Sequence, residues 1–264
     1  MKIGVFDSGL GGLYLLSSMV MSKDLSKYDY VYLGDTKNLP YGEKNQRQIL
    51  ELTSKGVDFL FRQGCQLVIV ACNTSSAQAL RKIQQNFLPK YYQDRRVLGV
   101  IRPTVELIKA GDTCVIATNA TVKAKAYTRE LRKLNSALKI SEIPAPELVP
   151  LLETNQLAKL EKAVRKYSAI IENKKVKNLI LGCTHYAIIG DKFAQSLGKG
   201  IKLISQDKVV PIKLLDYLNR HPKIDKKLTK KRQRKIYVTK LSLDFAKNAR
   251  TWFGQKVKLE LAKI

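Results

Sequence analysis

Short runs of apolar residues alternate with longer amphipathic segments along almost the whole chain. We predict eight strands from these runs, at residues 2–7, 30–35, 67–72, 97–101, 113–118, 138–143, 178–183 and 202–205. Most of the runs are apolar at successive positions, which is typical of parallel strands that helices cover on both faces.

Between the runs, segments 48–61 and 157–173 repeat their apolar residues near helical spacing. Regular alternation of strand and helix predicts the α/β class, in which ligands bind at the carboxyl ends of the strands. The chain should therefore present its functional side chains where the apolar runs end.

Two of these ends carry a cysteine beside polar residues. The run QLVIVACNTSSA (66–77) ends in Cys72, and NLILGCTHYA (178–187) ends in Cys183 before a hydroxyl and an imidazole. Each cysteine precedes a predicted helix, whose N-terminal amides favour an anion. A separation of 111 residues (183 − 72) fits two similar parallel-sheet α/β domains that face each other across an active-site cleft.

Composition predicts a globular protein of a reducing compartment. Of the 264 residues, 45% are hydrophobic, and the four cysteines show no C-x-x-C spacing. The N-terminus lacks the apolar core of a signal peptide, and no apolar run approaches the ~20 residues of a membrane span. We therefore expect a cytoplasmic protein with no membrane association.

The net charge is +26, from 48 basic and 22 acidic residues, and it favours polyanions or acidic metabolites as partners. Such a charge also suggests a positive interior that attracts carboxylates. The densest block, residues 226–235, lies in no recognised nucleic-acid motif, so we interpret it as a solvated basic loop. Nucleic-acid binding through this surface remains a second hypothesis.

The segment DSGLGGL (7–13) places Asp7 and Ser8 at the start of a glycine loop. It matches neither the dinucleotide fingerprint, since Tyr14 stands where a third glycine belongs, nor a phosphate-binding Walker loop. The loop permits close approach to a small ligand, or it is a tight turn with Asp7 as a helix cap.

Three interpretations compete for Cys183-Thr184-His185. Cys183 and His185, together with Cys72, could supply three metal ligands, but the spacing matches no familiar zinc pattern. Cys183 could be a buried structural residue. As an activated thiol, it would gain thiolate character from His185 or from a helix N-terminus.

Two thiols on opposite sides of one small ligand form a two-base device. One, as thiolate, removes a proton from carbon, and the other delivers a proton to the opposite face, so the carbon inverts without a cofactor or a metal. Asn73, Thr74 and Thr184 are candidate donors for the charge that develops on the substrate carboxylate.

These residues give the chain a resemblance to the glutamate racemases of the cofactor-independent aspartate/glutamate racemase superfamily. The resemblance spans most of the chain, through the segments 4–13, 32–42, 69–77, 117–122, 146–153 and 181–186. It implies an enzyme that makes D-glutamate for peptidoglycan and cell-wall biogenesis, with no cofactor, and that forms a homodimer. Aspartate or another amino acid remains an alternative substrate, because a pocket discriminates one methylene only weakly.

The resemblance also implies roles for individual residues. Cys72 and Cys183 would be the paired acid/base catalysts, assisted by Asp7 and His185, with Glu153 supporting His185. The remaining substrate-binding residues would be Ser8, Tyr41, Gly42, Asn73, Thr74, Thr121 and Thr184. Without the resemblance, Tyr41-Gly42 could be a plain turn, Thr121 a helix cap and Glu153 a solvated charge.

The resemblance places the active site between two domains. We predict an N-terminal domain of residues 1–96, completed by the C-terminal segment 207–264, and a second domain of residues 97–206.

Overall fold

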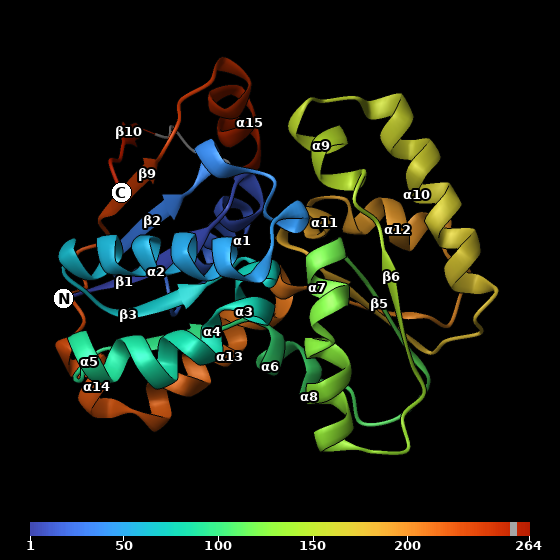
Figure 1. Ribbon diagram of the computed structural model, residues 1–264, viewed down its shortest axis with the longest axis horizontal. Helices are drawn as coiled ribbons and strands as arrows, with labels where there is room; N and C mark the ends of the chain where they lie inside the picture. The colour runs from blue at the N-terminus through green and yellow to red at the C-terminus, as the bar shows by residue number, and fades with distance from the viewer. Residues whose placement is uncertain (254–257) are drawn as a thin grey trace.

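A computed structural model describes residues 1–253 and 258–264, and it contains two parallel sheets (Figure 1). The first has six strands in the order β10-β9-β2-β1-β3-β4, and the second has four in the order β6-β5-β7-β8. Every strand pairing is parallel. The predicted α/β class with two parallel-sheet units is confirmed.

The strands of the first sheet are β1 (Lys2–Asp7), β2 (Tyr30–Gly34), β3 (Cys65–Val70), β4 (Arg96–Gly99), β9 (Arg234–Val238) and β10 (Leu259–Leu261). Those of the second are β5 (Thr113–Ala117), β6 (Ile140–Pro144), β7 (Asn178–Gly182) and β8 (Lys202–Ile204). All eight predicted strands are present.

Helices connect the strands. Up to β5 they are α1 (Leu10–Met21), η1 (Thr36–Asn38), η2 (Tyr41–Glu43), α2 (Gln46–Arg62), α3 (Asn73–Gln78), α4 (Leu80–Lys82), η3 (Ile83–Phe87), α5 (Leu88–Tyr91) and α6 (Ile101–Val105). After β5 they are α7 (Asn119–Ala124), α8 (Ala126–Leu134), α9 (Leu148–Glu153), α10 (Leu157–Glu172), α11 (Thr184–Ile188), α12 (Gly190–Ser196), α13 (Gln206–Arg220), α14 (Pro222–Lys227) and α15 (Leu243–Phe253). The two predicted helical segments, 48–61 and 157–173, correspond to α2 and α10.

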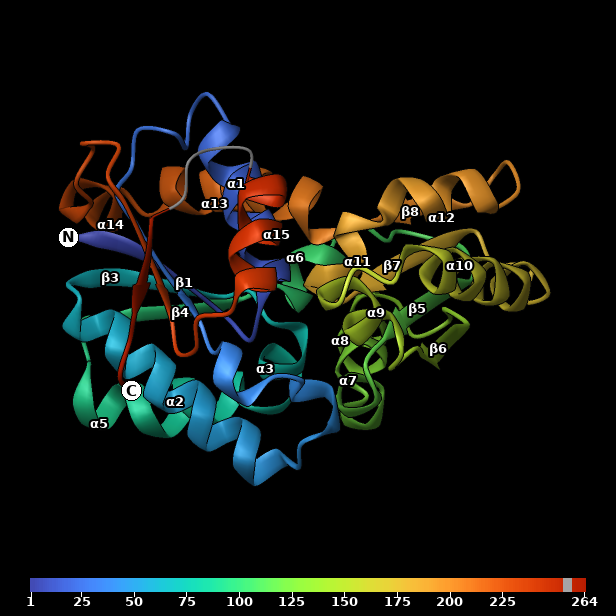
Figure 2. The same cartoon turned by 90° about the horizontal axis from the view of Figure 1, so that it is seen from above.

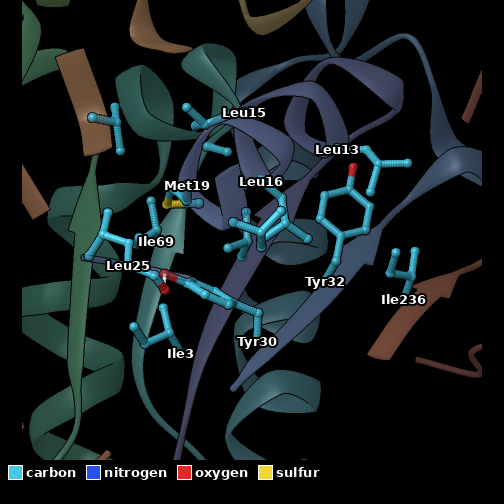
Figure 3. Close-up of a cluster of buried hydrophobic side chains, with 14 of the residues drawn as sticks. Ile3, Leu13, Leu15, Leu16, Met19, Leu25, Tyr30, Tyr32, Ile69 and Ile236 are labelled. Atoms are coloured by element: carbon cyan, nitrogen blue, oxygen red, sulfur yellow. Dashed lines mark hydrogen bonds between the residues drawn. The ribbon is translucent and has the colours of Figure 1, made fainter. Parts of the chain in front are cut away.

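Helices cover both faces of the first sheet. On one face α1, α13 and α15 pack on β1, β2 and β3. Figure 3 shows Leu16 and Met19 of α1 against Tyr30, Tyr32 and other strand residues of this core. On the other face α2 packs on β1, β2 and β3. Burial on both faces explains why these strands are continuous apolar runs.

The second sheet is covered in the same way. Leu160, Val164 and Ile171 of α10 belong to a cluster with residues of β5 and β7, and α8 contributes Tyr127 and Leu131 to a cluster with other residues of these strands. In both ribbon views the two units lie side by side, and α11 lies near their boundary (Figures 1 and 2). Helix α1 of the first unit packs on α11.

The C-terminal segment completes the first sheet, because β9 pairs with β2 and β10 pairs with β9. Strand β4 lies at the opposite edge, beside β3. The division into domains at residues 96/97 and 206/207 stays a prediction.

The interpretation of residues 226–235 as a solvated loop is wrong at both ends. Lys226 and Lys227 end α14, and Arg234 begins β9. The Arg234 guanidinium donates to the backbone oxygens of Tyr28 and Ser26, both at 2.6 Å. These bonds anchor the segment to the loop before β2.

Across the part of the chain that the structure describes, no helix is both long and apolar enough to cross a membrane.

Candidate active site

Cys72 and Cys183 line one cavity of about 300 Å³ at the boundary between the two units. Cys72 follows β3 of the first sheet, and Cys183 follows β7 of the second. Both therefore lie at carboxyl ends of parallel strands, where α/β proteins bind ligands. The cavity wall consists of Ser8, Leu39, Pro40, Tyr41, Gly42, Glu43, Cys72, Asn73, Thr74, Thr118, Pro146, Glu147, Val149, Pro150, Cys183, Thr184 and His185.

The Cys72 thiol lies at the start of α3, where its Sγ accepts from the backbone N–H of Ser75 at 3.5 Å. The Ser8 hydroxyl lies 3.7 Å from the same sulfur. Burial, together with the nearby Asp7 carboxylate, raises the pKa of the Cys72 thiol to about 12. Cys72 is therefore a thiol, ready to donate a proton, at neutral pH.

Cys183 precedes α11, and its Sγ lies 3.9 Å from Nδ1 of His185. The other ring nitrogen, Nε2, lies 2.6 Å from Oε1 of Glu153. Burial by itself lowers the pKa of His185, but Cys183 and Glu153 outweigh it and raise this pKa well above its usual value. The charged imidazolium form of His185 is therefore favoured beside Cys183.

Asp7, the last residue of β1, is fully buried and joins the two units. Its Oδ1 accepts from the Gly9 N–H at 2.9 Å, and its Oδ2 accepts from the Thr184 hydroxyl at 3.1 Å. Burial raises the pKa of Asp7 to about 6, although His185 and the donors of Gly9 and Thr184 act in the opposite direction. This carboxyl can thus gain or lose a proton near neutral pH.

Hydroxyl groups join the units a second time at the cavity wall. Thr74 Oγ1 lies 2.9 Å from Thr118 Oγ1 and 3.3 Å from Thr121 Oγ1. Thr118 caps α7 by accepting from the backbone N–H of Thr121. Thr74 and Thr118 reach the cavity, whereas Thr121 contacts Thr74 from behind.

The loop that carries Tyr41 and Gly42 is held by a buried carboxylate. Tyr41 donates to Asp35 at 2.6 Å, and Thr239, directly after β9, donates to the same side chain at 2.7 Å. The C-terminal segment therefore helps to place this part of the wall.

The structure brings together most of the predicted site residues. Nine of them line the cavity, namely Ser8, Tyr41, Gly42, Cys72, Asn73, Thr74, Cys183, Thr184 and His185. Asp7, Thr121 and Glu153 lie behind them, each hydrogen-bonded to a lining residue.

Sequence reasoning missed eight lining residues, Leu39, Pro40, Glu43, Thr118, Pro146, Glu147, Val149 and Pro150. Thr118 and the segment 146–150 follow β5 and β6, so the strand-end rule could have found them. Among the residues that the structure describes, the wall contains two carboxylates and no lysine or arginine, so the expectation of a positive interior is wrong for the cavity itself.

Within residues 1–253 and 258–264, no group of three or more His, Cys, Asp or Glu side chains is placed to hold a metal ion. A larger cavity of about 450 Å³ is lined by residues of α6, α8 and α13, among others, but by neither Cys72 nor Cys183. Of these two cavities, the smaller one is lined by both Cys72 and Cys183.

Comparisons with known proteins show which family the chain resembles. A family model described as Asp/Glu/Hydantoin racemase matches residues 17–209, which include both cavity cysteines. The glutamate racemase of Dinoroseobacter shibae is 37% identical over 84% of this chain and 85% of its own length. That of Paracoccus denitrificans is 37% identical over 85% of this chain and 87% of its own length.

Solved structures give the same result. A glutamate racemase from Francisella tularensis, in complex with D-glutamate, has a TM-score of 0.88 at 30% identity and covers 99% of this chain and 97% of its own. An aspartate racemase from Picrophilus torridus has a TM-score of 0.56 at 20% identity, covers 83% of this chain and 95% of its own, and shares the fold alone. The chain belongs to the Asp/Glu/hydantoin racemase family, and its close relatives within that family are glutamate racemases.

Proposed function

We propose that this protein interconverts L- and D-glutamate by proton transfer at Cα between the substrate and two thiols, Cys72 and Cys183. One observation carries the proposal: the two sulfur atoms line the same small cavity from different sheets. The similarity to glutamate racemases over 84% of the chain supports the same substrate.

The proton balance is simple. The thiolate on one side takes the α-hydrogen as a proton, which breaks the Cα–H bond and leaves its electron pair on the substrate. The thiol on the other side then gives its proton to the opposite face of that carbon. After one turnover the sulfur that began as a thiolate is a thiol, and the opposite sulfur is a thiolate. The reverse reaction restores the starting state.

The surroundings of the two thiols differ, and this difference sets their starting states. Burial and Asp7 keep Cys72 protonated, while Cys183 lies beside the His185 imidazolium. For the enantiomer whose α-hydrogen faces Cys72, that thiol must lose its proton, and Asp7 is the nearby carboxylate that can take it up.

Neutral donors, in place of cations, would hold the substrate's carboxylates. Side chains of Ser8, Asn73 and Thr74 reach the cavity from the first unit, and Thr184 reaches it from the second. Donors that point at the α-carboxylate stabilise the charge that develops when Cα loses its proton.

We infer that the substrate is glutamate and not aspartate, because the curated relatives named above are glutamate racemases. Turnover of the two amino acids measured side by side, at equal concentration, tests this preference. Equal or faster turnover of aspartate would contradict it.

The family also suggests the cellular role. We propose that the product D-glutamate supplies peptidoglycan synthesis in the cytoplasm, and that the protein acts as a homodimer. Sedimentation velocity of the purified protein measures the oligomeric state directly.

Racemisation of L-glutamate in deuterated water tests the two-thiol scheme. We expect deuterium at Cα of the early D-glutamate, while the L-glutamate still present keeps its hydrogen, because different groups serve the two faces. The reaction should need no added cofactor. Retained optical rotation, or early D-glutamate that has kept the original hydrogen, would contradict the scheme.

Single substitutions test each thiol. Cys72→Ala and Cys183→Ala should each lower the racemisation rate by at least about a thousandfold, because each removes the acid/base group on one face. Cys114→Ala is the matched control, since Cys114 is fully buried in β5 and does not line the cavity. Wild-type turnover in either single active-site variant would rule out paired thiols.

A further inference from the structure

A buried amide in the cavity wall has a free donor. Asn73 is the first residue of α3, directly after Cys72, and is only 2% exposed. Its Oδ1 accepts hydrogen bonds, but its Nδ2 has no hydrogen-bond partner among the residues that the structure describes. A buried N–H without an acceptor is costly, and in a cavity wall it indicates that a ligand supplies the acceptor.

Two side chains outside the cavity hold the other end of this amide. Tyr127 of α8 donates its hydroxyl to Asn73 Oδ1 at 2.5 Å. Gln206, at the start of α13, donates Nε2 to the Tyr127 oxygen at 3.0 Å and to Asn73 Oδ1 at 3.4 Å. Tyr127 and Gln206 are fully buried, and neither lines the cavity.

The chain of hydrogen bonds has a direction. The Tyr127 hydroxyl accepts from Gln206 and donates its single proton to Oδ1 of Asn73. In this orientation of the amide, Asn73 Nδ2 and, at the far end of the chain of hydrogen bonds, Gln206 Oε1 have no partner among the residues that the structure describes. The reverse orientation would leave the oxygen of Asn73 without a donor, and that oxygen would repel a carboxylate.

We propose that Tyr127 and Gln206 are positioning residues that fix the Asn73 amide with its N–H groups toward a carboxylate of the substrate. This inference rests on the proposed function, which supplies that carboxylate. Asn73 follows a strand of the first sheet, whereas Tyr127 packs on the second sheet. The donor is therefore set by the docking of the two units.

A double-mutant cycle tests the inference. Tyr127→Phe removes only the hydroxyl, and we expect kcat/KM for glutamate to fall about tenfold, the effect of one weakened hydrogen bond to a charged group. The pH dependence should keep its shape, because neither thiol is touched. In an Asn73→Ala background the same substitution should have no further effect, because Tyr127 acts only through Asn73.

Tyr30→Phe is the matched control. Tyr30 is as deeply buried, and its hydroxyl donates to the Leu25 backbone oxygen within the first core, away from the cavity. Its loss should leave kcat/KM unchanged. If the losses from Tyr127→Phe and Asn73→Ala multiply, Tyr127 acts through general packing and the inference is wrong.

The Asn73 side-chain amide also gives a signal that does not depend on turnover. In ¹⁵N-labelled protein its NH₂ resonances, identified by their absence in Asn73→Ala, should shift when glutamate is added. Tyr127→Phe should reduce this shift. A wild type that racemises glutamate without the shift would overturn this inference alone, whereas a wild type that fails to racemise glutamate would overturn the proposed function.

Discussion

At the scale of one residue, the buried Asp7 carboxyl lowers the stability of the folded protein at pH 7. Its pKa is raised from 3.8 to about 6 because the carboxyl is fully buried. The protonated form is therefore favoured by the folded state. That contribution to stability is complete below pH 3.8 and is lost as the pH rises through about 6, so at pH 7 the ionised group destabilises the fold.

Asp7→Asn should consequently stabilise the protein at pH 7. The pKa difference predicts an increase of up to about 3 kcal/mol in the free energy of unfolding, and about half of that at pH 5. Asn keeps an acceptor for the Gly9 N–H, and the Thr184 hydroxyl can accept from its amide. Urea denaturation at the two pH values measures the effect, and a gain that is equal at both would contradict it.

The same substitution should change the pH dependence of catalysis. Below about pH 6 Asp7 is protonated and cannot accept the Cys72 proton, so kcat/KM of the wild type for the enantiomer whose α-hydrogen faces Cys72 should fall there. Asp7→Asn should be slower throughout and should lack this acidic limb. An unchanged limb near pH 6 in the variant would assign the limb to another group.

Glu153→Gln tests the support of His185. The raised pKa of His185 depends on Cys183 and on the Glu153 carboxylate at 2.6 Å, which together outweigh burial. The side-chain amide of this variant has nearly the shape of the Glu153 carboxylate but no charge, so the pKa of His185 should fall. The imidazolium is then lost at lower pH, and the alkaline loss of activity should begin at lower pH. We expect kcat/KM at pH 8 to drop roughly tenfold or more.

Glu161→Gln is the control for that experiment, since Glu161 pairs with Lys192 on the exposed face of α10. It should leave the pH–rate profile as it is. An alkaline limb that does not move in Glu153→Gln would show that Glu153 does not set the charge of His185.

At the scale of elements, the close packing of α1 against α11 and against the end of β1 explains two glycines of the DSGLGGL segment. A Cβ on Gly11 would lie 2.4 Å from Thr184 Oγ1 and 2.5 Å from the backbone nitrogen of His185. A Cβ on Gly12 would lie 2.2 Å from that of Asp7. These glycines lie in α1 itself, and their role is close approach of the helix to active-site residues.

Gly11→Ala should therefore impair both stability and catalysis. Separating α1 from α11 costs about 1–3 kcal/mol by overpacking and displaces Thr184 and His185, so kcat/KM should fall. Gly190→Ala in α12 is the control, because its nearest neighbours would be 3.6 and 3.8 Å away. Gly190→Ala should unfold at the same denaturant concentration as the wild type or at a higher one. Equal stability and equal kcat/KM of Gly11→Ala and Gly190→Ala would contradict this account.

Elements differ in how far the sequence predicts them, for physical reasons. Strands β1, β2, β3, β5 and β7 are buried at almost every position and therefore form apolar runs, whereas β4, β6 and β8 are only partly buried. Strand β9 begins with Arg234 and Lys235, and β10 is three residues long with Glu260 at its centre, so neither gives such a run. Their place in the first sheet depends on pairing with distant strands, which no local pattern encodes.

The candidate site was predictable where its chemistry is rare. Only two histidines and four cysteines occur, so a cysteine beside a polar group at a strand end is conspicuous. The support of Asn73 by Tyr127 and Gln206 was not predictable in this way, because tyrosine and glutamine are common on helices and only docking of the two units brings them together.

At the scale of the whole molecule, charge is distributed unevenly. The chain carries +26, yet the cavity wall, as far as residues 1–253 and 258–264 form it, contains Glu43 and Glu147 and no lysine or arginine. The basic block 226–235 joins the first sheet at Arg234, which pairs with Tyr30 at the amino end of that sheet. The cavity lies at the carboxyl ends of the strands, so the block and the cavity occupy opposite ends of that sheet.

This arrangement predicts that the net charge acts on substrate capture and not on the chemical step. Glutamate carries one net negative charge at pH 7, and the screening length falls from about 30 Å to about 10 Å between about 0.01 and 0.1 M salt. We expect KM to rise a few-fold over this range while kcat stays constant.

The triple variant Lys226→Gln, Lys227→Gln, Lys231→Gln should match the wild type at 0.1 M salt, because the block is remote from the cavity. The same variant should lose whatever affinity the wild type has for a DNA or RNA oligomer at low salt. A kcat that falls with salt, or a slower triple variant at 0.1 M salt, would mean that the basic surface takes part in catalysis.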